Sequence, residues 1–243
     1  MSNVVTGLVE TFSPRRNVRH GPLPSLLVVM TVVTGLVDAF SYLVLGHVFV
    51  ANMTGNVVFL GFALAGAPGF SITASFAAIA AFVLGAGLGG RLYAKGRWHR
   101  GTLLYRASFI QAVFLLAGMI LALQVTSPAN GGYRYTLIGV MGIAMGVQNA
   151  TARKLAVPDL TTTVLTLTIT GMVADVGDVA SVGPANTRRL IAILSMFVGG
   201  LVGAVLVLHS ALFSPLLIAT LLIASIALVA LLLSRGDEQW HHT

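Results

Sequence analysis

The segment GLVDAFSYLVLGHVFVANMTGN, from Gly35 to Asn56, combines an apolar run with a carboxylate and a polar interruption. Asp38 lies near the centre of the apolar run 25–48, which is long enough to cross a bilayer. A charged side chain at the bilayer centre is costly, so Asp38 is expected to face a partner or a wet cavity. The run ends in the polar stretch 52–56, after which the sequence becomes apolar again.

The composition is that of a membrane protein. Hydrophobic residues make up 56% of the chain and charged residues only 9%, whereas a soluble domain carries roughly a quarter charged residues. Repeated apolar runs of helical length predict an all-α polytopic membrane protein. The net charge of +7 comes from basic residues in short segments between the runs, so we expect no nucleic-acid partner. With no cysteine and no clustered histidines, we expect no metal and no cofactor.

The distribution of basic residues predicts how many runs cross the membrane. The apolar runs are 25–48, 57–67, 72–90, 103–125, 136–150, 160–182, 190–212 and 214–234. If all eight crossed, the fourteen Lys and Arg residues would divide evenly between the two sides. If 57–67 and 160–182 enter and leave on one side, only Arg134 lies apart from the others, as the positive-inside rule favours. We therefore expect six crossing helices, with both termini in the cytoplasm.

The two halves of the chain resemble each other. The pattern Gly35…Asp38-Ala39 matches Gly146…Asn149-Ala150, and the stretch 52–56 loosely matches 159–163. Three crossings per half would give the copies opposite orientations, an arrangement common in transporters. The sequence thus predicts two inverted three-helix repeats at 23–126 and 127–235, each with a short broken or re-entrant helix. A basic tail (1–22) and a short tail (236–243) are expected in the cytoplasm. Chance similarity among glycine-rich helices is the alternative.

These motifs resemble those of the YoaK-like family of small bacterial inner-membrane proteins. The most specific string is Asn52-Met-Thr-Gly-Asn56, and the similarity extends from about residue 25 to 235. The resemblance implies a location in the bacterial inner membrane and about six spans, and it implies no established substrate. The chain has Leu167 after Thr166, where the family pattern tends to have glycine.

The polar stretches 52–56 and 159–163 are called here the first and second interruptions. Polar residues in and beside them are the candidates for the solute pathway. Thr54 is expected to cap a short helix that begins near Gly55, whose free N–H groups would favour an anionic or carbonyl-bearing ligand. The alternatives are a structural Asp38 that locks two helices, a plain helix cap at the membrane surface, and amides that join helices. The candidate residues are Asp38, Asn52, Thr54, Gly55, Asn56, Gln148, Asn149, Thr161, Thr162, Thr163 and Thr166.

Two acidic residues, Asp175 and Asp178, have several interpretations. They could hold a cation, pair with Arg188 or Arg189, or end a helix in water. We favour a salt bridge or a solvated position over a binding site.

The sequence favours a secondary transporter or channel that passes a small polar solute, of which an anion is one kind, through a polar site near the membrane midplane. The alternative is a membrane scaffold or sensor that transports nothing. No Walker motif, nucleophile elbow or HExxH pattern is present, so we do not expect an enzyme. The expected partners are the lipid bilayer and the solute, and a homo-oligomer is left open.

Overall fold

The computed structural model describes residues 7, 11–12, 20–93, 99–124, 131–163, 165–174 and 182–234. This part of the chain is helical, with loops between the helices and no strand. The helices are α2 (Leu23–Val44), α3 (Met53–Leu64), α4 (Ile72–Tyr93), α5 (Arg100–Leu123), α6 (Gly132–Leu155), α7 (Thr166–Ala174), α8 (Val182–His209) and α9 (Ser214–Leu233). Six of these helices are long, and α3 and α7 are short.

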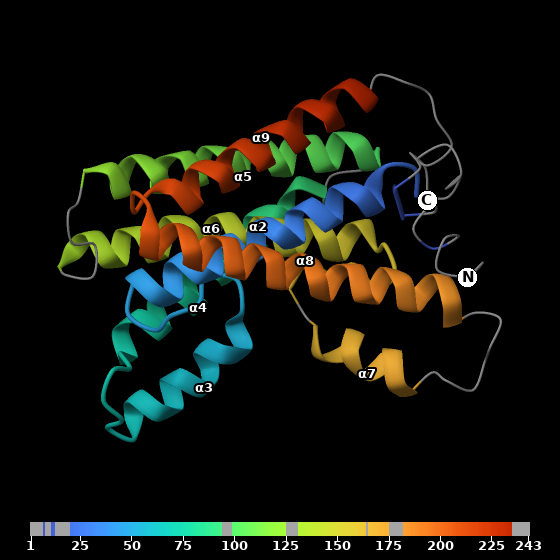
Figure 1. The fold of residues 1–243 in the computed structure, drawn as a ribbon. Helices are drawn as coiled ribbons and strands as arrows, with labels where there is room; N and C mark the ends of the chain where they lie inside the picture. Colours follow the sequence, from blue (N-terminus) through green and yellow to red (C-terminus); the bar gives the residue numbers. More distant parts are fainter. Residues whose placement is uncertain are drawn as a thin grey trace.

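The six long helices form a bundle with their axes along one common direction (Figure 1). The closest neighbours are α4 with α6, α2 with α8, and α5 with α9. Helix α2 supplies much of the core, including Leu27, Met30 and Phe40, none of which is exposed. Helices α3 and α7 lie along the same edge of the bundle in Figure 1 and do not contact each other. Each packs instead on one long helix, α3 on α4 and α7 on α8.

Glycines set the closest helix crossings. A Cβ on Gly35 of α2 would lie 2.5 Å from Met196 O and 2.6 Å from Gly200 N of α8. A Cβ on Gly146 of α6 would lie 2.2 Å from Phe82 O and 2.7 Å from Ala86 N of α4. Only glycine permits backbones to approach this closely. The two crossings use the same kinds of atom, at positions with the same spacing along each helix.

The helix contacts repeat in the same way. The equivalence is seen when α2, α3, α4 and α5 are exchanged with α6, α7, α8 and α9, respectively. Every contacting helix pair in the described part of the chain then becomes a contacting pair, either a different one or, for α5 with α9 and α2 with α6, the same one. For example, α2 with α9 becomes α6 with α5, and α3 with α4 becomes α7 with α8. The two halves therefore make equivalent contacts.

Five of the described helices are long and apolar enough to cross a membrane: α2, α4, α5, α8 and α9. Helix α6 has 24 residues and is more polar, since it carries Gln148, Asn149, Arg153 and Lys154 near its C-terminal end. The chain is a membrane protein on the evidence of these apolar helices.

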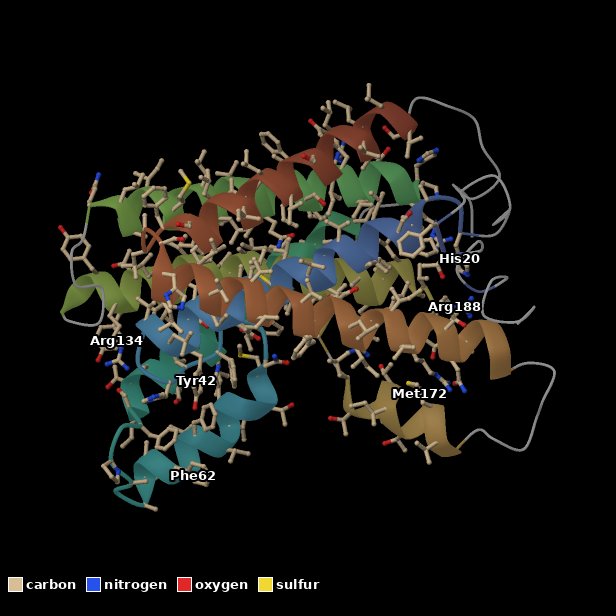
Figure 2. The ribbon with its side chains drawn as sticks, in the orientation of Figure 1. His20, Tyr42, Phe62, Arg134, Met172 and Arg188 are labelled. Carbon is tan, nitrogen blue, oxygen red and sulfur yellow. The ribbon has the colours of Figure 1, made fainter. Side chains whose placement is uncertain are left out.

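Two arginines, one buried and one partly buried, link the ends of helices. Arg134, at the start of α6, donates to Leu45 O at 2.7 Å and to Gly46 O at 3.2 Å, beyond the last turn of α2. Arg100, at the start of α5, donates to Leu155 O at 2.5 Å, the last residue of α6. A cation stabilises the carbonyl end of a helix. Figure 2 shows Arg134 at one end of the bundle and Arg188 at the other.

Candidate functional site

The first interruption is closed onto α2 by Asp38. Its Oδ1 accepts hydrogen bonds from the backbone N–H groups of Val50 (3.1 Å) and Ala51 (2.9 Å). Its Oδ2 accepts a 2.6 Å bond from the side-chain amide of Asn52. Asp38 is 5% exposed, and these donors supply the partners that a buried carboxylate requires. Asp38 therefore holds the loop before α3 against the C-terminal half of α2.

Asn56 holds the same loop from the other side. Its Oδ1 accepts from Phe49 N at 2.9 Å, and its Nδ2 donates to Phe49 O at 2.5 Å. Asn56 is fully buried, and both ends of its side-chain amide bond to the backbone of Phe49. The ring of Phe49 leaves no room for a side chain at Gly55, where a Cβ would lie 2.8 Å from the ring.

The prediction that Thr54 caps α3 is wrong, because Asn52 holds the N-cap position. The helix begins at Met53, and its N-cap is Asn52, whose side chain makes no capping hydrogen bond. The amide of Asn52 is directed to Asp38 instead. Thr54 lies inside the first turn and is exposed. Asp38 competed for the side chain that would otherwise have capped the helix.

Aromatic side chains fill the space beside this interruption. Tyr42 stacks on Phe49 with ring centroids 5.0 Å apart, and Phe49 stacks on Phe59 at 5.7 Å. His47 and Phe70 extend the group through ring contacts. Figure 2 shows Tyr42 on the side of the bundle that faces α3.

The second interruption has an equivalent side-chain bond. Thr163 Oγ1 donates to Asn149 Oδ1 at 2.6 Å, and Asn149 Nδ2 donates to Met145 O at 3.0 Å. Asn149 follows Gly146 with the spacing at which Asp38 follows Gly35. The bond makes Thr163 the counterpart of Asn52, whereas the sequence pairing had placed it opposite Asn56.

The other threonines of the second interruption differ in burial. Thr161 is exposed, and Thr162 is 3% exposed with an Oγ1 that has no hydrogen-bond partner in the described structure. Thr162 also has a φ of 63°, in the left-handed region. Thr166 begins α7, and its carbonyl accepts from Thr170 Oγ1 at 2.9 Å.

A cavity of about 500 Å³ opens beside Asn149 and Thr163. Most of its lining is apolar, and the polar contributions are few. It is lined by Phe82, Ala86, Asn149, Ala150, Ala152, Arg153, Ala156, Val157, Leu160, Thr161 and Thr163. The sequence did not single out Arg153, whose place one turn after Asn149 was the available signal.

Gln148 belongs to a different polar cluster, inside the bundle. Its Nε2 donates to Thr34 Oγ1 at 2.8 Å, and its Oε1 accepts from Gln111 Nε2 at 2.6 Å. Gln111 Oε1 and Ser108 Oγ, both on α5, are buried without a partner in the described structure. Gln111 and Ser108 were missed, although both are polar residues in the apolar run 103–125.

Asp175 and Asp178 lie outside the described residues. Arg189 Nε pairs with Asp159 Oδ1 at 2.8 Å, and Arg188 approaches Asp159 Oδ2 at 3.9 Å. Within the described residues, no group of three or more acidic or histidine side chains is placed to hold a metal ion.

The fold and these sites define a helical membrane protein with polar interruptions on one edge of its bundle. The chain belongs to the family described as "Protein of unknown function (DUF1275)", which matches residues 26–229. It is 32% identical over 157 residues to the UPF0700 transmembrane protein YoaK of Bacillus subtilis (strain 168). That alignment covers 63% of this chain and 66% of YoaK, just under two thirds of its length. The resemblance to the YoaK-like family is thereby confirmed. No solved structure matches the chain.

Proposed function

We propose that the protein is a secondary transporter or channel for a small polar or anionic solute. It would lie in the bacterial inner membrane with six crossing helices, both termini in the cytoplasm, and no enzymatic activity. The solute would pass between the two interrupted segments and the long helices on which they fold.

The repeated helix contacts support two inverted repeats. The glycine crossings of α2 with α8 and of α6 with α4 involve equivalent atoms in the two halves. Helices α3 and α7 are equivalent members of these halves and are too short to cross a bilayer, with 12 and 9 residues. Interrupted helices in paired repeats are typical of solute sites in transporters.

The observation that carries the proposal is the matched pair of interruptions. Asn52 bonds to Asp38 in one half, and Thr163 bonds to Asn149 in the other. Irregular backbone at membrane depth is tolerated only where it is buried in protein or lines water. The cavity beside Asn149 supplies such a space in the second half.

Cysteine labelling tests the proposal, because the natural chain has no cysteine. Thr161→Cys, at the cavity wall, should react with a small polar maleimide in membranes. The matched control is Phe197→Cys, on the exposed apolar surface of α8, which should react only with a lipophilic reagent. A Thr161→Cys variant that folds and is inert to the polar reagent would contradict a water-filled pathway.

A scaffold or sensor is the second candidate. It is favoured by the saturation of Asp38 and Asn56, whose polar atoms are all engaged within the loop. Proteoliposomes separate the two candidates: a transporter accelerates the flux of some small solute over protein-free vesicles, and a scaffold accelerates none.

A further inference from the structure

The two interruptions differ in what fills the space beside them. Tyr42 follows Gly35 by seven residues, and Arg153 follows Gly146 by seven, so the two positions are equivalent. By the same spacing, Leu160 is the counterpart of Phe49. In the first half, Tyr42 and Phe49 stack and occupy the space. In the second half, Arg153 and Leu160 line the open cavity.

The charges differ in the same sense. Where the first half has the carboxylate of Asp38, the second half has the neutral amide of Asn149. Arg153 makes no hydrogen bond or ion pair with any described residue. The described carboxylate closest in sequence, Asp159, is paired with Arg189 and Arg188. The cavity therefore has one available cation and no available anion among its described lining residues.

The rest of the cavity wall is mainly apolar. Phe82, Val157 and Leu160 are its large apolar side chains, and four alanines and the neutral polar residues Asn149, Thr161 and Thr163 make up the rest of the lining beside Arg153. A ligand that fits this wall carries one negative group and an otherwise apolar body, because unpaired polar groups would lose hydration without compensation. A carboxylate matches the planar fork of an arginine.

We propose that this cavity binds a small organic monoanion with an apolar body, of the short-chain carboxylate class. Arg153 holds the carboxylate through charge-assisted hydrogen bonds, and Phe82, Val157 and Leu160 contact the body. The inference deepens the proposed function and rests on it, since it names the substrate class of the second interruption. The anionic headgroup of a lipid shares this chemistry, and the test separates the two sources.

The test is equilibrium binding of radiolabelled hexanoate to the full-length protein in nanodiscs of phosphatidylcholine alone. Hexanamide, which has the same shape without the charge, should fail to compete. Arg153→Gln should weaken binding about tenfold to a hundredfold, because a charge-assisted hydrogen bond is lost. Arg153→Lys should retain part of the affinity.

Two control variants accompany this measurement. Lys154→Gln removes the neighbouring cation, which does not line the cavity, and should leave affinity within about twofold. Ala86→Leu keeps every charge and fills the cavity, so it should weaken binding of hexanoate. Equal affinity in Arg153→Gln and the unmodified protein overturns the proposal.

Lipid occupancy is measured in parallel. Nanodiscs that contain phosphatidylglycerol should leave hexanoate affinity unchanged. If phosphatidylglycerol displaces hexanoate and copurifies in an Arg153-dependent manner, the occupant is a lipid and the proposal is overturned. Failure of the proposed function gives a different result: hexanoate then binds through Arg153 and does not cross the membrane of proteoliposomes.

Discussion

The side-chain amide of Asn52 donates a 2.6 Å hydrogen bond to Asp38 Oδ2 and thereby closes the loop before α3 onto α2. Asp38→Ala removes the acceptor for this amide and for the N–H groups of Val50 and Ala51. Each buried donor left without a partner costs about 1–3 kcal/mol. We expect a clear fall in the thermal midpoint of the purified protein, and a smaller fall for Asp38→Asn, which keeps one acceptor oxygen.

The double variant Asp38→Asn with Asn52→Asp is the control for this pair. It exchanges the two groups, so the amide oxygen at position 38 can still accept from the loop. The amide nitrogen at that position can then donate to the carboxylate at position 52. We expect the double variant to recover part of the stability that Asp38→Asn loses. Additive losses in the double variant would show that the two side chains do not act as a pair.

The helical membrane architecture was predictable because hydropathy limits where helices of membrane length can form. Run 57–67 was too short to cross, and α3 (Met53–Leu64) is indeed short. Run 160–182 was long enough to cross, yet the described α7 covers only Thr166–Ala174. The threonine-rich stretch before α7 forms an irregular loop, in which Asp159 and Thr162 both have positive φ.

The sequence placed the candidate residues at two interruptions, whereas their contacts depend on how the helices pack. Asn149 matches Asp38 in its spacing from glycine, and each of the two side chains bonds to a side chain of the loop that follows its helix. Adjacent residues on a helix point in different directions. Which of Gln148 and Asn149 faces the loop is decided by the packing of the helices, so the sequence did not distinguish the two. Arg153 was interpreted only as a charge that orients the chain in the membrane, and its place at a cavity depends on the loop that follows α6.

Substitution of two neighbouring glycines on α8 by alanine is expected to change the stability of the protein in different directions. A Cβ on Gly199 would lie 2.1 Å from Val32 O, whereas one on Gly200 meets nothing within 4 Å. Gly199→Ala should destabilise the protein by about 1–3 kcal/mol because α2 must move away. Gly200→Ala should be neutral or stabilising, by up to about 1 kcal/mol, since alanine favours the helix. Unfolding in mixed micelles measures both.

Two glycines on α4 allow a similar comparison, because Gly85 is the counterpart of Gly199 and Gly87 lies two residues further along the helix. A Cβ on Gly85 would lie 2.1 Å from Ile143 O, and one on Gly87 meets nothing within 4 Å. The same contrast between Gly85→Ala and Gly87→Ala is expected if the two halves pack alike. Equal stability for all four variants would contradict the close crossings.

The buried hydroxyl of Ser108 gives a third prediction. Its Oγ has no partner in the described structure, whereas Ser195 Oγ donates to Ile191 O at 2.7 Å. Removing an unsatisfied buried hydroxyl relieves a penalty of about 1–3 kcal/mol. Ser108→Ala should therefore raise the thermal midpoint, and Ser195→Ala should leave it unchanged or lower. A lower midpoint for Ser108→Ala would mean that an ordered water or a solute satisfies this hydroxyl.

The final prediction concerns orientation in the membrane. Arg134 lies at the end of the bundle where α2 ends, and its guanidinium is engaged by Leu45 O and Gly46 O. A structural role as a helix cap explains a basic residue at this end. The other described Lys and Arg residues lie toward the end of the bundle opposite to Arg134. They include Lys154 near the end of α6 and Arg188 near the start of α8. The positive-inside rule assigns that opposite end to the cytoplasm.

Single cysteines at two exposed positions test this orientation. Ala211→Cys, in the turn between α8 and α9, should react with a membrane-impermeant maleimide in intact cells. Lys154→Cys, near the end of α6, should react only after the cells are permeabilised, because an odd number of crossings separates α6 from that turn in the six-span arrangement. Labelling of both positions in intact cells, or of Lys154→Cys alone, would contradict the six-span arrangement and the cytoplasmic placement of both termini.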